Sequence, residues 1–186
     1  MVNISIISPS VRKGRLSHRA ALYLHNYIQE NRLACSEILD LDHYRFPLFD
    51  ERLRHQESPS SEMLDFAEKV RNSDGVIIIS PEYNGGYPAS LKNAIDLLYD
   101  EWQRKPVGLV SVSDGIFGGT QAVTSLQFVL WKIGVWLVPV SFRIPYINKA
   151  LDENGVPADK ETIDTRARIL TDELLWCIKA RKAVTK

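Results

Sequence analysis

The sequence has 186 residues, of which 45% are hydrophobic and 25% are charged, and this size and composition predict a single globular domain over residues 1–186. The 23 basic residues balance the 23 acidic residues, so the formal net charge is zero. A neutral chain lacks the field that attracts nucleic acid or an anionic membrane, and it lacks the strong negative charge of an acidic electron carrier.

Short apolar runs rich in β-branched residues predict five strands, at residues 2–7, 36–41, 75–79, 106–112 and 136–140. The third and fourth runs are almost continuously apolar, which is typical of parallel strands covered on both faces. Between the strands, apolar residues recur at helical spacing. The predicted helix faces are marked by Ala21, Leu24 and Ile28; by Met63, Phe66, Ala67 and Val70; by Leu91, Ile95 and Leu98; by Val123, Leu126, Leu130 and Ile133; and by Ile163, Ala167, Leu170, Leu174 and Cys177.

Strict alternation of strands and helices predicts an α/β fold, a three-layer α/β/α sandwich around a five-stranded parallel sheet. Five strands in a chain of this length favour the flavodoxin-like order 2-1-3-4-5 over the six-stranded dinucleotide-binding fold. Ligands of such sheets bind beyond the carboxyl ends of the strands, near the point where the strand order reverses. We therefore expect a ligand at the loops after the first, third and fourth strands.

The loop after the first strand, residues 8–19, combines serine hydroxyls with several basic side chains just before a predicted helix. The free N–H groups of a helix N-terminus and arginine guanidinium groups both favour a phosphate. An N-capping role for Ser17 beside a solvated set of cations explains the same composition, and this loop alone does not decide between the two interpretations. Neither G-x-x-x-x-G-K-[ST] nor G-x-G-x-x-G occurs in the chain.

The other two loops are rich in glycine. Residues 80–88 place Asn84-Gly85-Gly86 between Tyr83 and Tyr87, a sequence that allows positive φ and a close approach of the backbone to a ligand. Residues 113–120 contain three glycines, although a flexible loop before a helix would explain these equally well. Taken together, one phosphate-binding wall and two glycine-rich walls predict a crevice for flavin mononucleotide (FMN).

The three loops resemble those of the NADPH-dependent FMN reductase family, which includes quinone, chromate and azo-dye reductases. The family's first loop reads approximately G-S-x-R-x-x-S-x-N; here Pro9 replaces the glycine, Ser10 and Arg12 match, Arg15 stands at the second serine and Ser17 at the asparagine.

Two further signatures support this resemblance, which extends over residues 1–133. The second signature, P-E-Y-N-G followed by P-x-x-L-K-N-A-I-D, is matched by residues 81–85 and 88–96. The third, a serine that ends a strand and a glycine pair shortly after it, is matched by Ser113, Gly118 and Gly119.

The resemblance implies an enzyme that passes hydride from NADPH or NADH through bound FMN to a small-molecule acceptor such as a quinone, a free flavin or an azo compound. It also implies three sets of site residues. The FMN phosphate would be held by Ser10, Arg12, Arg15, Ser17 and His18. The isoalloxazine ring would lie along Pro81, Glu82, Tyr83, Asn84 and Gly85. Its pyrimidine side would border on Ser113, Gly115, Gly118 and Gly119. No side chain is needed as a general acid or base, and no metal-ligand spacing stands out.

The family also implies a homodimer or homotetramer, with residues 46–49, Trp102 and Trp136 as candidate contacts. We expect a cytoplasmic protein with no membrane partner, because no apolar run approaches the ~20 residues that span a bilayer. The two cysteines, Cys35 and Cys177, do not form a disulfide framework, and we expect both to be buried.

Two alternatives stay open at this point. One is a one-electron flavin carrier of the same fold, although such carriers resemble T-x-T-G-x-T at the phosphate loop and are strongly acidic. The other is a flavodoxin-like interaction protein that has lost FMN binding. Pro9, which removes a backbone donor, and Asp114, a carboxylate near an expected anion, favour this second alternative.

Overall fold

The structure is a computed structural model that describes residues 1–184. Five parallel strands form a sheet in the order β2-β1-β3-β4-β5. This order confirms the flavodoxin-like sheet expected from the alternation of strands and helices. The strands are β1 (Asn3–Ser8), β2 (Cys35–Asp40), β3 (Gly75–Pro81), β4 (Pro106–Val112) and β5 (Trp136–Ile144).

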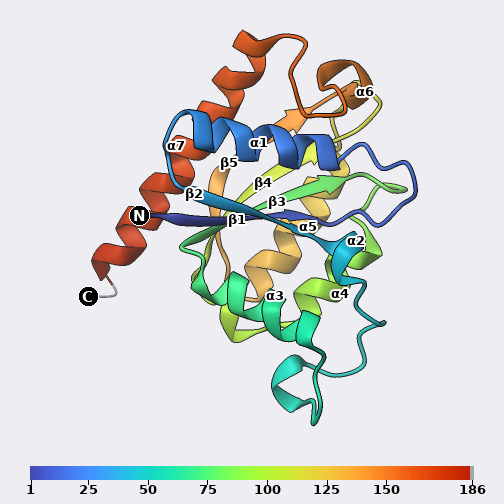
Figure 1. The fold of residues 1–186 in the computed structure, drawn as a ribbon, viewed down its shortest axis with the longest axis vertical. Coiled ribbons are helices and arrows are strands. Elements are labelled where there is room, and N and C mark those ends of the chain that lie inside the picture. Colours follow the sequence, from blue (N-terminus) through green and yellow to red (C-terminus); the bar gives the residue numbers. More distant parts are fainter. Residues whose placement is uncertain (185–186) are drawn as a thin grey trace.

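Helices cover both faces of this sheet. The helices are α1 (His18–Glu30), α2 (Leu41–Tyr44), α3 (Ser61–Asn72), α4 (Ala89–Leu97), α5 (Thr120–Lys132), α6 (Ile147–Ala150) and α7 (Lys160–Val184), with two 3₁₀ turns, η1 (Leu53–His55) and η2 (Asp100–Trp102). Helices α1 and α7 lie on one face, and α3, α4 and α5 lie on the other (Figure 1).

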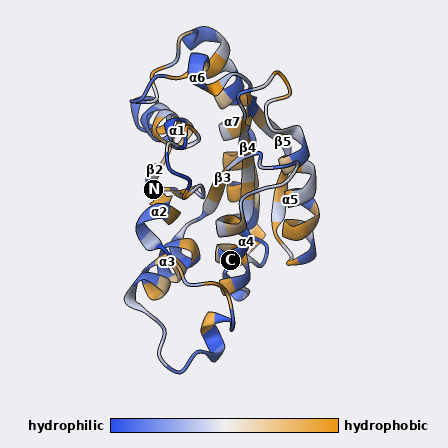
Figure 2. Cartoon of the chain, turned by 90° about the vertical axis from the view of Figure 1, so that its right-hand side faces the viewer, coloured by the Kyte–Doolittle hydropathy of each residue, from blue (hydrophilic) through white to orange (hydrophobic). Residues whose placement is uncertain are grey.

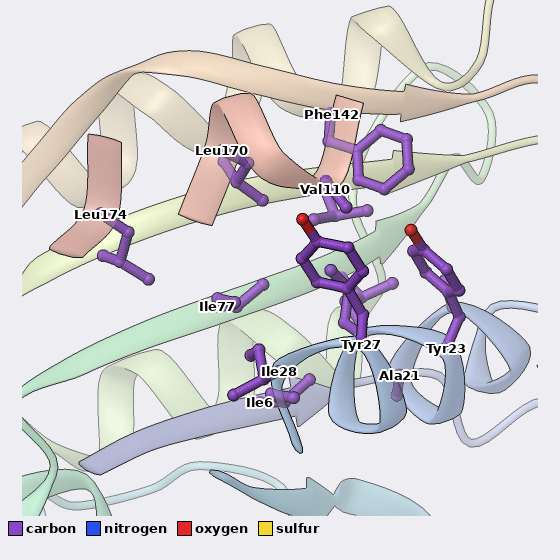
Figure 3. Packing of buried hydrophobic residues seen from close by; sticks show 14 of the residues in the cluster. Ile6, Ala21, Tyr23, Tyr27, Ile28, Ile77, Val110, Phe142, Leu170 and Leu174 are labelled. Atoms are coloured by element: carbon purple, nitrogen blue, oxygen red, sulfur yellow. The ribbon is translucent and has the colours of Figure 1, made fainter. Parts of the chain in front are cut away.

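A separate apolar core fills each side of the sheet. Ile77 of β3 packs into the core under α1 and α7, whereas its neighbour Ile78 packs into the core under α3, α4 and α5. Figure 3 shows the first core, in which Tyr23 extends from α1 towards Phe142 of β5, with ring centroids 6.3 Å apart. Successive strand residues point to opposite faces, so a strand covered on both sides must be apolar throughout.

The strand ends agree closely with the sequence-based expectations, except at β5. That strand continues to Ile144 instead of ending at residue 140. Ser141 and Arg143 interrupt the apolar pattern there, because β5 is an edge strand and is only partly covered. Its pairing with β4 also contains a bulge: Val107 pairs with Leu137, but Leu109 pairs with Ser141.

Two expectations about buried side chains are wrong, and one is confirmed. Cys177 is buried, but Cys35 is exposed, because it begins edge strand β2, whose amino end is poorly covered. Trp102, expected as a subunit contact, is fully buried and donates its indole N–H to the carbonyl of Ile95.

The carboxyl ends of the strands meet at one edge of the sheet, which faces the viewer in Figure 2. Strands β1 and β3 are neighbours there, but the chain leaves β1 towards β2 and leaves β3 towards β4. The strand order therefore reverses between β1 and β3, and the loops that follow them diverge at this point. No helix within residues 1–184 is both long and apolar enough to cross a membrane.

Candidate functional site

A groove of about 330 Å³ lies at this edge, between the loops that follow β1, β3 and β4. Seven predicted site residues line it: Arg12, Arg15, Ser17, Pro81, Glu82, Tyr83 and Ser113. Asp114, which the sequence raised as a carboxylate near the expected anion, also lines the groove and is exposed. The sequence did not single out the remaining lining residues, among which Val112 and Ile147 provide apolar surface. Ile147 comes from α6, and no sequence signal connected that segment with the three loops.

Ser17 marks the end of the groove at the N-terminus of α1. The residue is 3% exposed, and its hydroxyl has no hydrogen-bond partner among residues 1–184. Although Ser17 occupies the N-cap position, its side chain makes no capping bond, and the first turn of α1 has no acidic residue. An anion would supply the missing partner and would be stabilised by the positive end of the helix dipole.

Arg12 and Lys13 bring positive charge to the same end of the groove. Both are exposed, and no salt bridge in the described part of the chain involves either of them. The Arg12 guanidinium lies over the ring of Tyr83, 5.8 Å from its centroid. The positive charges of Arg12 and Lys13 are therefore available to a ligand.

Arg15, by contrast, is engaged within the protein. Its guanidinium forms a two-pronged ion pair with Asp40 at the end of β2 and donates to the carbonyl oxygen of Ser10, 2.5 Å away. The Asp40 hydrogen bond raises the pKa of Arg15. Burial raises the pKa of Asp40, but the hydrogen bonds from Arg15 and from the Asp42 backbone outweigh it, so the net shift is downwards. Both groups are therefore charged at neutral pH.

His18 and Ser10, two of the predicted phosphate-binding residues, do not line the groove. The Nδ1 atom of His18 is 3.1 Å from the Ser8 hydroxyl and 3.5 Å from an oxygen of Asp40. Burial lowers the pKa of His18 in spite of this carboxylate, so the neutral imidazole is favoured at pH 7. The hydroxyl of the buried Ser10 is hydrogen-bonded to the Tyr83 hydroxyl at 2.6 Å, which ties the β1 loop to the β3 loop.

Asn84 and Gly85 form a tight turn at the tip of the β3 loop. Both have positive φ, 51° for Asn84 and 77° for Gly85. The turn is closed by two backbone hydrogen bonds between Tyr83 and Gly86, of 2.8 and 3.0 Å. Asn84 and Gly85 do not line the groove in this structure, but the turn holds the backbone of Tyr83, which does.

The glycines of the β4 loop differ from one another in their roles. Gly118 and Gly119 are buried and have positive φ, and the carbonyl of Gly118 accepts a hydrogen bond from the Ser111 hydroxyl at 2.6 Å. Gly115 is exposed, and its carbonyl accepts a hydrogen bond from the Ser113 hydroxyl. The loop is thus anchored at its glycine pair, whereas its middle lies at the surface.

Two residues of the second family signature have roles that sequence reasoning missed. The Ser90 hydroxyl donates to the carbonyl of Pro9 at 2.5 Å, which holds the start of the β1 loop against α4. The Asn93 side chain bonds the carbonyl of Pro47 and the N–H of Phe49, and so holds the long loop after α2. Both residues also line a second cavity of about 510 Å³, whose lining includes Val11 of the β1 loop. The signature specifies Asn93 and could have identified it, whereas Ser90 stands at one of its variable positions and carried no such signal.

Comparison with known proteins places all three loops within one family match. Residues 2–149 match the model of the family described as NADPH-dependent FMN reductase. A quinone reductase of Pseudomonas putida is 34% identical over 98% of this chain and 97% of its own length. The NAD(P)H-dependent FMN reductase LOT6 of Saccharomyces cerevisiae is 32% identical over 84% of this chain and 88% of its own. Among solved structures, FerB, a flavoenzyme NAD(P)H:(acceptor) oxidoreductase of Paracoccus denitrificans, is similar with a TM-score of 0.77 at 25% identity, covering 96% of this chain and 98% of that chain.

Proposed function

The chain belongs to the NADPH-dependent FMN reductase family, and we propose that the groove between its β1, β3 and β4 loops is where it binds FMN. As a member of this family it is an FMN-dependent NAD(P)H oxidoreductase, with FMN as cofactor and NAD(P)H as hydride donor. The observation that carries the proposed site is the buried, unpartnered hydroxyl of Ser17 at the N-terminus of α1.

The α1 end of the groove suits a phosphate. A buried hydroxyl without a partner costs about 1–3 kcal/mol, and a phosphate oxygen beside Ser17 would remove that cost. Arg12 and Lys13 add two positive charges that form no salt bridge within the described chain. Arg15 is proposed to act on the phosphate mainly by shaping the loop, because Asp40 already holds its guanidinium.

The opposite end of the groove suits a flat ring. Pro81 and Tyr83 form one wall, Ser113 forms another, and Val112 and Ile147 contribute apolar surface. Ligand pockets typically have volumes of about 300–1,000 Å³ and combine apolar walls with a few polar groups. The β4 loop reaches the groove at Ser113 and Asp114, and the pyrimidine side of the ring is proposed to lie against this segment.

FMN, when bound, supplies the redox chemistry, by taking up hydride from NADPH or NADH and passing electrons to the acceptor. The protein's contribution is to bind and orient, and no residue is assigned as a general acid or base. We propose a quinone, free flavin or azo compound as the acceptor, because a quinone reductase is among the relatives that match almost the whole chain.

Three finer properties belong to the same proposal. We propose a single-domain protein, since both cores share one sheet, and a cytoplasmic one, since both cysteines are unpaired. We also propose a homodimer. Exposed apolar side chains at Leu48 and Phe49, beside the second cavity, support a subunit contact there, and half-exposed Trp136 provides another candidate.

Titration of the purified protein with FMN and with riboflavin, followed by quenching of flavin fluorescence, tests the site. We expect FMN to bind more tightly than riboflavin, because riboflavin lacks the phosphate. Steady-state oxidation of NADPH with menadione then tests the activity. Binding without turnover would indicate a one-electron carrier, and no binding of either flavin would indicate an interaction protein.

A further inference from the structure

We propose that Glu82 is a positioning residue of the groove: its carboxylate caps helix α5 from the neighbouring loop and thereby fixes the spacing between the β3 and β4 loops. The inference rests on the proposed function in so far as these loops hold the flavin ring. It assigns the Glu82 side chain a role at helix α5, in addition to the place of this residue in the lining of the groove.

The contacts of the carboxylate carry the argument. The Oε2 atom of Glu82 accepts hydrogen bonds from the backbone N–H groups of Gln121, at 2.9 Å, and of Ala122, at 3.3 Å. Both N–H groups belong to the first turn of α5, whose donors have no partners within the helix. A carboxylate in this position satisfies two of them and also interacts favourably with the positive end of the helix dipole.

Helix α5 needs this external cap, because it lacks one of its own. Its N-cap residue is Gly119, which has φ of 81° and no side chain to accept a hydrogen bond. A larger residue does not fit there: a Cβ atom on Gly119 would lie 3.1 Å from the Cβ of Ser111 and 3.2 Å from the carbonyl oxygen of Val112. The close packing that requires glycine therefore removes the usual cap, and Glu82 replaces it across a sequence separation of 39 residues.

The cap connects two walls that are otherwise anchored to different strands. The glycine pair of the β4 loop is held to β4 by the hydrogen bond from Ser111 to Gly118. The β3 loop is held to the β1 loop by the hydrogen bond between Tyr83 and Ser10. Glu82 joins these two assemblies, so its loss should let the ring-binding walls move apart.

The same contact bears on the orientation of the ligand. Helices α1 and α5 both begin at this edge of the sheet, and each N-terminus could attract an anion. At α5 the carboxylate of Glu82 already occupies that position, whereas the first turn of α1 contains no acidic residue. Glu82 therefore leaves α1 as the end of the groove that favours the phosphate.

Glu82→Ala and Glu82→Gln test the proposal through two measurements. Hydrogen exchange of the Gln121 and Ala122 amides, measured by NMR without any flavin, should be accelerated about fivefold in Glu82→Ala, in line with the ~1 kcal/mol typical of a lost N-cap. The affinity for FMN and for riboflavin should fall by the same factor of about five, because the ring walls are shared by both ligands. Glu82→Gln keeps an acceptor oxygen and should recover most of each loss.

Asp159→Ala is the matched control, since Asp159 accepts a hydrogen bond from the Thr162 N–H at the start of α7, outside the groove. It should cost a similar amount of stability and leave both flavin affinities unchanged. Unchanged amide exchange in Glu82→Ala would overturn the cap. Accelerated exchange with unchanged riboflavin affinity would overturn the positioning role. If the parent protein binds neither flavin, the proposed function fails, and the exchange measurement still decides whether the cap exists.

Discussion

Asp40, the last residue of β2, holds the guanidinium of Arg15 with both carboxylate oxygens, and the bond from Nη2 to Oδ2 measures 2.5 Å. The pair is largely buried, with 14% of the Arg15 side chain and 5% of the Asp40 side chain exposed. It ties the middle of the β1 loop to the neighbouring strand. The family motif has a serine where this chain has Arg15, so this ion pair is a feature of the chain's own residues.

Asp40→Asn should therefore destabilise the protein by about 3 kcal/mol at pH 7, because it leaves a largely buried guanidinium without its counter-charge. Urea unfolding monitored by circular dichroism measures the difference. Asp42→Asn is the control: Asp42 lies 3.8 Å from Arg15 and is 34% exposed, so its loss should cost less than about 1 kcal/mol. Equal effects of the two substitutions would show that the ion pair contributes little.

The same pair predicts a pH dependence. The pKa of Asp40 is lower in the folded protein than its ordinary value of 3.8, so the unfolded chain binds a proton more readily. The stabilisation that ionised Asp40 provides is complete above its pKa in the unfolded chain. It is lost as the pH falls through its pKa in the folded protein. The stability difference between the parent and Asp40→Asn should thus be constant from pH 7 to about pH 5 and should shrink below about pH 4. A stability difference that stayed constant down to pH 2 would contradict the lowered pKa of Asp40.

Ser17→Ala should have opposite effects on stability and on binding. Removing a buried hydroxyl that lacks a partner should raise the free energy of unfolding of the flavin-free protein by about 1 kcal/mol. It should also weaken FMN binding, since the proposed phosphate contact is lost. Ser5→Ala is the matched control, because the Ser5 hydroxyl in β1 is also buried without a partner but does not line the groove. It should stabilise the protein and leave FMN affinity unchanged.

Arg12→Ala should weaken FMN binding by about 1.5–3 kcal/mol, the range for hydrogen bonds to charged groups. Riboflavin affinity should stay unchanged, and the effect on FMN should diminish at high salt, because the side chain is exposed. Parallel fluorescence titrations with both flavins measure this. Arg168→Ala, at an exposed position of α7, serves as control. An equal loss for riboflavin would show that Arg12 acts through its contact with the Tyr83 ring instead.

Gly119→Ala should destabilise the protein by about 1–3 kcal/mol, because the residue has φ of 81° and a Cβ would press against Ser111. Gly115→Ala provides the comparison, since a Cβ there meets nothing within 4 Å and its φ is not positive. Thermal unfolding of both variants distinguishes them. If Gly115→Ala proved as harmful as Gly119→Ala, a general need for loop flexibility would explain the result better than close packing.

The sequence predicted the strands well where both faces of the sheet are covered by helices. Strand β4 was predicted without error, because both of its faces are covered and its residues are therefore apolar throughout. The end of β5 was missed for the opposite reason, since Ser141 and Arg143 reflect an edge strand. The exposure of Cys35 was missed on similar grounds: sheet position, which a local pattern does not encode, decides how well a strand is covered.

The candidate site could be located from the sequence, but its internal contacts could not. Glycine-rich and basic loops after parallel strands indicated where the groove lies. The partner of each side chain depends on which loops become neighbours in space. The pairing of Arg15 with Asp40 joins residues 25 positions apart, and that of Glu82 with α5 spans 39 positions. The pairing with Asp40 determines that Arg15 shapes the loop, and the pairing of Glu82 determines how α5 is capped.

The bulge in β5 has a consequence for how copies of this chain can associate. Pro139 lies within the bulge and has no N–H to offer, so the outer margin of β5 is a poor template for an additional strand. At the other margin of the sheet, β2 exposes the charged side chain of Glu37. Edge-to-edge strand pairing between copies is thereby discouraged at both margins of the sheet, and even concentrated preparations should resist fibril growth.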